Sequence, residues 1–155
     1  MRTITPAALA AALALAAAAA PAHAQVPGDD VDPAIADGRA QQRLDAAHDT
    51  WRAAGVRSYR YRARHLCFCG PDVTDPARIV VRDRRPVDPP RRLRKMATVT
   101  RLFRLVQGAI DDRVADLQVR YDERGVPRRI FVNSLLQLAD EEETYVVRRF
   151  RPLED

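Results

Sequence analysis

The residues best suited to chemistry in this chain are Cys67 and Cys69, the only two cysteines among its 155 residues. An even number of cysteines in an exported protein favours a disulfide. Residues i and i+2 of an extended strand lie about 6.5 to 7 Å apart at Cα, near the upper limit for a bridge. We therefore predict a Cys67–Cys69 disulfide with a local kink at Phe68, which closes too short a loop to stabilise the fold strongly.

Two other uses of the cysteine pair stay open at this point. His65, Cys67 and Cys69 share one face of a predicted strand, and all three are ligands suited to copper or zinc. Three ligands on one strand cannot surround an ion, so a fourth would come from elsewhere, such as His48 or a carboxylate. The third use is thiol redox catalysis, which favours a cysteine at a helix N-terminus, where its pKa is lowered.

Motifs for hydrolysis or phosphate binding are absent from the sequence. It has no G-x-S-x-G, no H-E-x-x-H and no glycine-rich phosphate loop. We interpret His48 as a histidine at the boundary of a helix surface. The acidic run from Asp140 to Glu143 lacks the alternating ligand spacing of a calcium loop and is interpreted as a solvated turn. We predict no catalytic residue and no cofactor.

Four tyrosines fall in predicted strands, where arginines occupy many of the alternate positions: Tyr59, Tyr61, Tyr121 and Tyr145. Because Tyr and Arg are favoured at the centres of protein interfaces, these side chains could form a recognition face. The alternative is that they are half-buried strand residues, for which tyrosine is well suited.

The N-terminus predicts export. Arg2 precedes an uncharged Ala/Leu stretch that Pro21 ends, and Ala22-His23-Ala24 is a small-x-small cleavage site. We expect residues 1–24 to be a signal peptide that is cut before Gln25. The apolar run, about 14 residues, is too short to span a bilayer. The mature protein is expected in the periplasm or outside the cell, without a membrane span.

The charge of the chain sets weak limits on its partners. The net charge of +5 falls to +4 after cleavage, because only Arg2 is lost. Nearly every basic residue is arginine, with Lys95 the sole lysine, and we interpret this as compositional bias rather than selection for an anionic partner. We expect a monomer that binds a protein, an envelope component or a small ligand, and no nucleic acid.

Hydrophobic periodicity predicts the elements that position these residues. Residues 25–38 read as a flexible lead, and residues 39–155 as one domain. Helices are expected from Arg39 to Gly55 and from the N-cap Thr98 to about Asp111. Five strands are expected at residues 58–69, 78–82, 117–121, 128–133 and 144–150, with Gly125 in a left-handed hairpin position.

This order, α-β-β-α-β-β-β, predicts an α+β fold. The sheet should be mostly antiparallel, with about five strands and both helices packed on one face. Six residues on the apolar stripes of these elements should form its core: Trp51, Leu102, Phe103, Val106, Val119 and Ile130.

Several of these motifs occur together in a recognisable set: Trp51, Ser58-Tyr59-Arg60-Tyr61, Cys67-Phe68-Cys69, Thr98-Val99, Leu102-Phe103, Tyr121-Asp122, Gly125, Pro127 and Ile130. From about residue 40 onward, the chain resembles the exported bacterial family catalogued as domain of unknown function 6174. The resemblance implies export and no particular activity. Arg84-Arg85 stands where such proteins tend to have Gly, and Asn133 stands where Asp is expected, so we predict no carboxylate site there.

Overall fold

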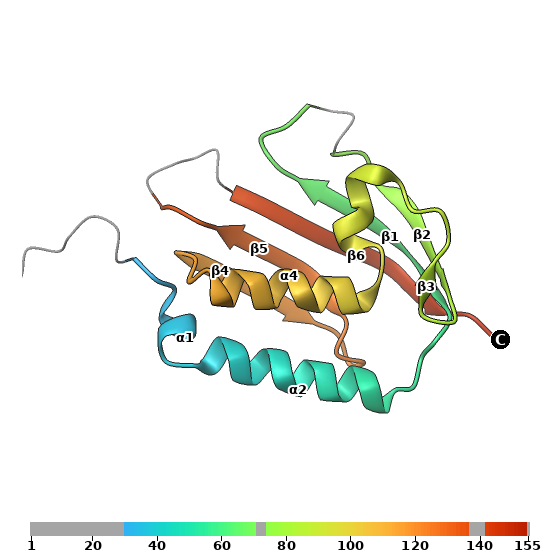
Figure 1. The fold of residues 1–155 in the computed structure, drawn as a ribbon, viewed down its shortest axis with the longest axis horizontal. Coiled ribbons are helices and arrows are strands. Elements are labelled where there is room, and N and C mark those ends of the chain that lie inside the picture. Colours follow the sequence, from blue (N-terminus) through green and yellow to red (C-terminus); the bar gives the residue numbers. More distant parts are fainter. Residues whose placement is uncertain (1–29, 71–73, 137–141, 155) are drawn as a thin grey trace, which may run out of the picture.

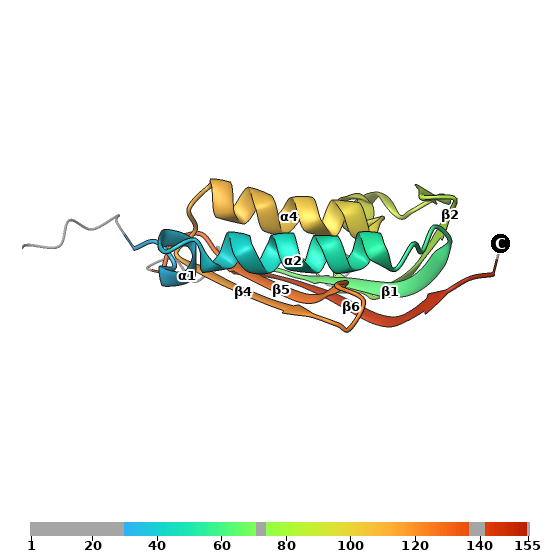
Figure 2. The ribbon, with the colours of Figure 1, turned by 90° about the horizontal axis from the view of Figure 1, so that it is seen from below.

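The computed structural model describes residues 30–70, 74–136 and 142–154 of the chain. These residues form two layers, in which a six-stranded antiparallel sheet carries helices on one face (Figures 1 and 2). Figure 2 shows the helices on one side of the sheet, with no described element on the other. The predicted α+β architecture is confirmed, with one strand more than expected. None of the described helices has the length and apolar character needed to cross a bilayer.

In the described part of the chain, the sheet is covered by α1 (Pro33–Ala36), α2 (Arg39–Ala53), the 3₁₀ helix η1 (Arg91–Met96) and α4 (Val99–Asp111). Helix α2 buries four residues that recur at steps of three and four: Ala40, Leu44, Ala47 and Trp51. Helix α4 begins as predicted, because the Thr98 hydroxyl accepts a hydrogen bond from the Arg101 N–H at 3.1 Å. Both long helices were expected from the sequence, whereas α1 and η1 were not.

The sheet has the strand order β3-β2-β1-β6-β5-β4. Its strands are β1 (Tyr59–Leu66), β2 (Ala77–Arg82), β3 (Arg85–Pro86), β4 (Asp116–Tyr121), β5 (Pro127–Asn133) and β6 (Glu142–Pro152). Strand β1 lies in the centre, between β2 and β6. It ends at Leu66 rather than at Cys69 as predicted, because the chain bends through residues 67–69.

The core lies between the helices and the sheet. Five of the six predicted core residues are buried, including Leu102, Phe103 and Ile130. Val119 is only partly buried against this core, because β4 is an edge strand with a neighbour on one side only.

Residues 30–38 correct the prediction of a flexible lead. The Asp32 N–H donates to the Val114 carbonyl, and Asp32 itself is 8% exposed. Its carboxylate accepts from the Ala34 N–H at 2.7 Å, which caps α1, and from the Leu117 N–H at 2.8 Å on the edge strand β4. The chain is therefore packed against the domain from about Val31. Residues 25–29 and the predicted signal peptide lie outside the described residues.

Candidate functional site

The cysteine pair lies at the bend that follows β1. Cys67 and Cys69 are at disulfide distance, with Cα atoms 5.2 Å apart. This separation is shorter than an extended strand allows, so the predicted kink is present. Cys67 is half-buried, whereas Cys69 is exposed and the Phe68 side chain is 85% exposed. The bend therefore turns a large apolar ring toward solvent.

His65 connects this bend to strand β6. Its ring stacks on Tyr145, with centroids 4.5 Å apart, and its Nδ1 lies 3.9 Å from the Cys67 sulfur. Glu143 Oε1 is 3.5 Å from His65 Nε2, and Nε2 has no hydrogen-bond partner among the described residues. The Tyr145 hydroxyl donates a hydrogen bond to the same Glu143 carboxylate. Burial lowers the pKa of His65, although Glu143 opposes this effect. Burial therefore favours the neutral form of His65.

The metal alternative gains little support from these positions. No group of three His, Cys, Asp or Glu residues within 30–70, 74–136 and 142–154 is placed to hold an ion. His48, considered as a fourth ligand, lies on α2 in an edge-to-face contact with Phe103, with ring centroids 4.9 Å apart. The acidic run 140–143 falls partly outside the described residues, and of it the structure describes only Glu142 and Glu143.

The tyrosines do not form an exposed recognition face. Tyr59, Tyr61 and Tyr145 are 3%, 1% and 4% exposed, because they lie on the side of the sheet that the helices cover. The Tyr61 hydroxyl donates to the Met96 carbonyl, and burial raises the pKa of Tyr61. Tyr121 is half-buried, and burial raises its pKa to about 12. The half-buried or buried strand role is therefore the one the structure supports.

The Tyr59 and Tyr61 hydroxyls connect the sheet to the segment before α4. Tyr59 accepts a hydrogen bond from the Val99 N–H at 3.0 Å, at the first turn of α4. Tyr61 reaches the last residue of η1. These two bonds position η1 and α4 over the centre of the sheet.

The opposite face of the sheet, which no described element covers, carries arginines from five strands. Arg62 on β1 lies directly between Arg78 on β2 and Arg148 on β6. Arg120 on β4 lies opposite Arg129 on β5. We define the arginine face as these side chains together with others on the same surface or lining the same grooves: Arg60, Arg62, Arg64, Arg78, Arg120, Arg129, Arg148, Arg149 and Arg151.

The charges of the arginine face are not neutralised within the described part of the chain. None of its nine side chains forms an ion pair with a described carboxylate, whereas Arg39, Arg52 and Arg124 elsewhere each have one. Like charges directly opposite each other in a sheet are destabilising. In the sequence, the alternation of arginine along β1 was the only sign of this face.

Two adjoining grooves run across the arginine face. One, of about 420 Å³, is lined by Arg60, Arg62, Arg78, Arg149 and Arg151 together with Tyr61. The other, of about 350 Å³, is lined by arginines together with Leu66 and Val146. Guanidinium groups bind phosphate and carboxylate through paired hydrogen bonds, so this face can hold several anionic groups at once.

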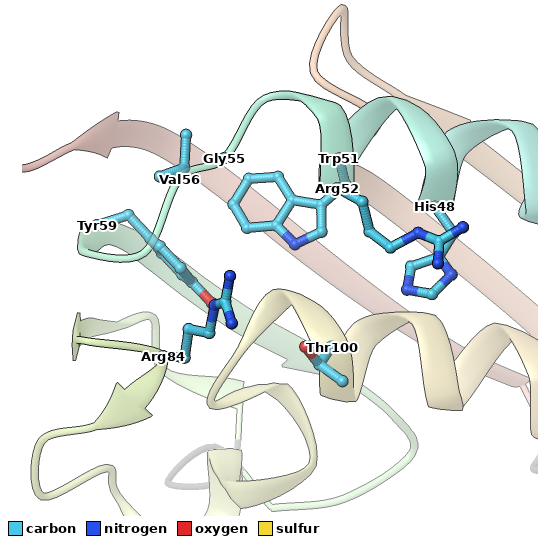
Figure 3. A pocket seen from close by; sticks show the side chains of 8 residues that line it. All are labelled: His48, Trp51, Arg52, Gly55, Val56, Tyr59, Arg84 and Thr100. Carbon is cyan, nitrogen blue, oxygen red and sulfur yellow. The ribbon is translucent and has the colours of Figure 1, made fainter.

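A separate pocket of about 330 Å³ lies between the C-terminal end of α2 and the start of α4 (Figure 3). Trp51 and Tyr59 supply aromatic surface, and Arg84 reaches in from the turn between β2 and β3. Arg84 has φ +63°, a left-handed conformation that favours glycine, at the position where the resemblance noted above leads one to expect Gly. Of the two arginines that line the pocket, Arg52 is paired with Asp49.

Comparison with known proteins gives one match. A family model described as a family of unknown function (DUF6174) matches residues 43–152, which extend from α2 to the end of β6. No curated protein and no solved structure matches the chain. The matched region contains the cysteine pair, the arginine face and all eight residues that line the Figure 3 pocket, so function has to be argued from these surfaces.

Proposed function

The chain belongs to this family of unknown function, DUF6174, and we propose that it is an exported, non-catalytic module that binds an anionic surface of the cell envelope through its arginine face. The observation that carries the proposal is the row of like charges on an uncovered sheet, without carboxylate partners in the described residues. Export is supported by the predicted signal peptide at residues 1–24.

The spacing of the arginines suits a surface of closely packed phosphates. Arg78, Arg62 and Arg148 project from three adjacent strands, which are about 4.8 Å apart. Each basic side chain near an anionic bilayer contributes about 1 kcal/mol to binding. Loss of three of them should therefore weaken binding by about 3 kcal/mol, on the order of 100-fold. Binding should also weaken with salt, because the charges are exposed.

The cysteine pair has a structural role in this proposal. We propose that Cys67 and Cys69 form a disulfide in the exported protein, since their Cα separation of 5.2 Å suits a bridge. A metal or thiol-redox role is the alternative, and its support is the 3.9 Å approach of His65 Nδ1 to the Cys67 sulfur.

The test compares two triple variants that carry the same net charge. Arg62→Gln, Arg78→Gln and Arg148→Gln remove the central row of the arginine face, and the control Arg39→Gln, Arg52→Gln and Arg104→Gln removes three exposed arginines from the helices. Co-sedimentation with vesicles of phosphatidylglycerol and phosphatidylcholine measures binding, with pure phosphatidylcholine as the uncharged reference.

We expect the wild-type protein and the helix variant to bind anionic vesicles within about three-fold of each other. The sheet variant should bind on the order of 100-fold more weakly, and 500 mM salt should release all three proteins. Equal weakening in both variants would show that only net charge matters. Tighter binding of the wild type to duplex DNA than to the vesicles would also contradict the proposal.

A further inference from the structure

The arginine face changes character along β1. Arg60, Arg62 and Arg64 occupy successive outward positions, and the next one is Leu66. In the register of the sheet, Leu66 lies opposite Thr144 on β6, and Thr144 lies opposite Phe131 on β5. The row of arginines therefore ends at a row of uncharged side chains on the same face.

The next pair on this face is Asn133 and the exposed Glu142, and exposed apolar side chains occur where the chain leaves β1 and β5. Phe68 follows β1 and is 85% exposed, and Leu135 and Leu136 follow β5 and are 47% and 56% exposed. Strands β1 and β5 are each antiparallel to β6, so they end at the same end of the sheet. We call these three exposed side chains, together with the half-buried Leu66 and Phe131, the apolar end.

The distribution of exposed large apolar residues is one-sided. Among the described residues, the fourth such side chain is Val87, at 53% exposure, which follows β3. The turn between β2 and β3 lies at the end of the sheet where β1 begins, because β2 is antiparallel to β1. Val87 is therefore at the opposite end of the sheet from Phe68. Its replacement provides a control for the loss of an exposed apolar side chain away from the apolar end.

We infer that the apolar end inserts into the boundary between head groups and acyl chains of an anionic phospholipid bilayer while the arginine face contacts the phosphates. The inference rests on the proposed function and names its partner. A soluble polyanion offers charge but nothing to bury these side chains, whereas a bilayer offers both within a few ångströms. Exposed apolar surface beside a basic face is the pattern of interfacial membrane binding.

The bend at the cysteines prepares Phe68 for this contact. Cys67 is half-buried and its sulfur approaches His65, whose ring is stacked on Tyr145 of the core. The short covalent ring through Cys69 holds the intervening residue in place, and the Phe68 ring projects into solvent. A restrained backbone at this position loses less conformational entropy on binding than a free loop does.

The experiment replaces Phe68 by tryptophan and follows its fluorescence on anionic vesicles. Phe68→Trp should shift its emission to shorter wavelength and be quenched by lipids brominated on their acyl chains. Trp51, the only natural tryptophan, is 9% exposed, so the wild-type protein measured in parallel gives its background. Phe68→Trp bound to vesicles with no shift and no quenching would overturn the inference.

A second pair of variants separates the inference from the proposed function. Phe68→Ser should weaken vesicle binding at least ten-fold and leave binding to soluble inorganic polyphosphate unchanged, because only the lipid buries the ring. Val87→Ser should change neither. A Phe68→Ser protein that binds vesicles as tightly as the wild type refutes insertion alone. A wild-type protein that binds neither vesicles nor polyphosphate refutes the arginine face as well.

Discussion

Replacement of Gly125 by alanine tests how the turn between β4 and β5 packs against α2. Gly125 has φ +78°, as predicted for the hairpin, and a Cβ added there would lie 2.0 Å from the carbonyl oxygen of Ala47. It would also lie 3.1 Å from the backbone nitrogen of Trp51. The contacted atoms belong to a helix backbone and cannot rotate away, so the turn or the whole of α2 has to move.

The expected loss of stability has two parts. The left-handed conformation costs an L-residue about 1–2 kcal/mol. Forcing extra volume into a packed contact costs about 1–3 kcal/mol more. We therefore expect Gly125→Ala to lower the free energy of unfolding by about 2–5 kcal/mol, which is a large share of the stability of a small domain.

Gly55→Ala is the control for the conformational part. Gly55 also has a positive φ, +63°, but no atom lies within 4 Å of its added Cβ. Its replacement should cost only about 1–2 kcal/mol. Urea unfolding followed by Trp51 fluorescence measures both variants. Equal losses in the two would show that the turn does not pack on α2, and that this part of the architecture is misplaced.

Three further predictions concern the lead, the cysteines and the histidine. Asp32→Ala should cost about 1–3 kcal/mol in urea unfolding, because it leaves the buried Leu117 N–H without its partner, while exposed Asp30→Ala should cost almost nothing. Thiol titration of the native exported protein should find no free cysteine, and calorimetry on the reduced protein should detect no binding of Cu(I) or Zn(II). Binding of one metal equivalent that His65→Ala weakens would favour the metal alternative. Burial lowers the pKa of His65 below its usual 6.5, so the unfolded chain takes up the proton first as pH falls. Stability should decline as pH falls below about 7, and His65→Gln should flatten that decline.

Elements with a local sequence signal were predicted correctly, whereas elements defined by contacts with distant residues were missed. The apolar period of α2, the cap at Thr98 and the left-handed Gly125 each depend on neighbours within a few residues. Helix α1 was missed because Asp32 is anchored by Leu117, 85 residues away, and no local signal records that contact. The two-residue β3 is likewise defined by its pairing with β2.

The tyrosines and arginines show the same limit for the candidate site. Alternation in β1 correctly separated Tyr59 and Tyr61 from Arg60 and Arg62, but it does not say which face the helices cover. The helices bury the tyrosines, and the arginines lie on the other face of the sheet. Only the strand register places Arg62 between two further arginines from distant segments. Composition shows an excess of charge but not where it collects.

The register also offers a way to decide whether the arginine face is kept for binding. Like charges directly opposite each other destabilise a sheet by roughly 0.2–1 kcal/mol per pair, and Arg62 faces two such neighbours, Arg78 and Arg148. Arg62→Gln should therefore raise the free energy of unfolding at low salt, and the gain should shrink at 500 mM salt, where the repulsion is screened.

The same substitution should weaken vesicle binding, so stability and binding should move in opposite directions. That opposition is expected when a surface is maintained for a partner at the expense of the fold. Arginines that reflect composition alone should show no loss of binding when the repulsion is relieved. If Arg62→Gln destabilised the domain at low salt, the row of arginines would be structural, through contacts of their long side chains with the sheet, and the argument from unneutralised charge would fail.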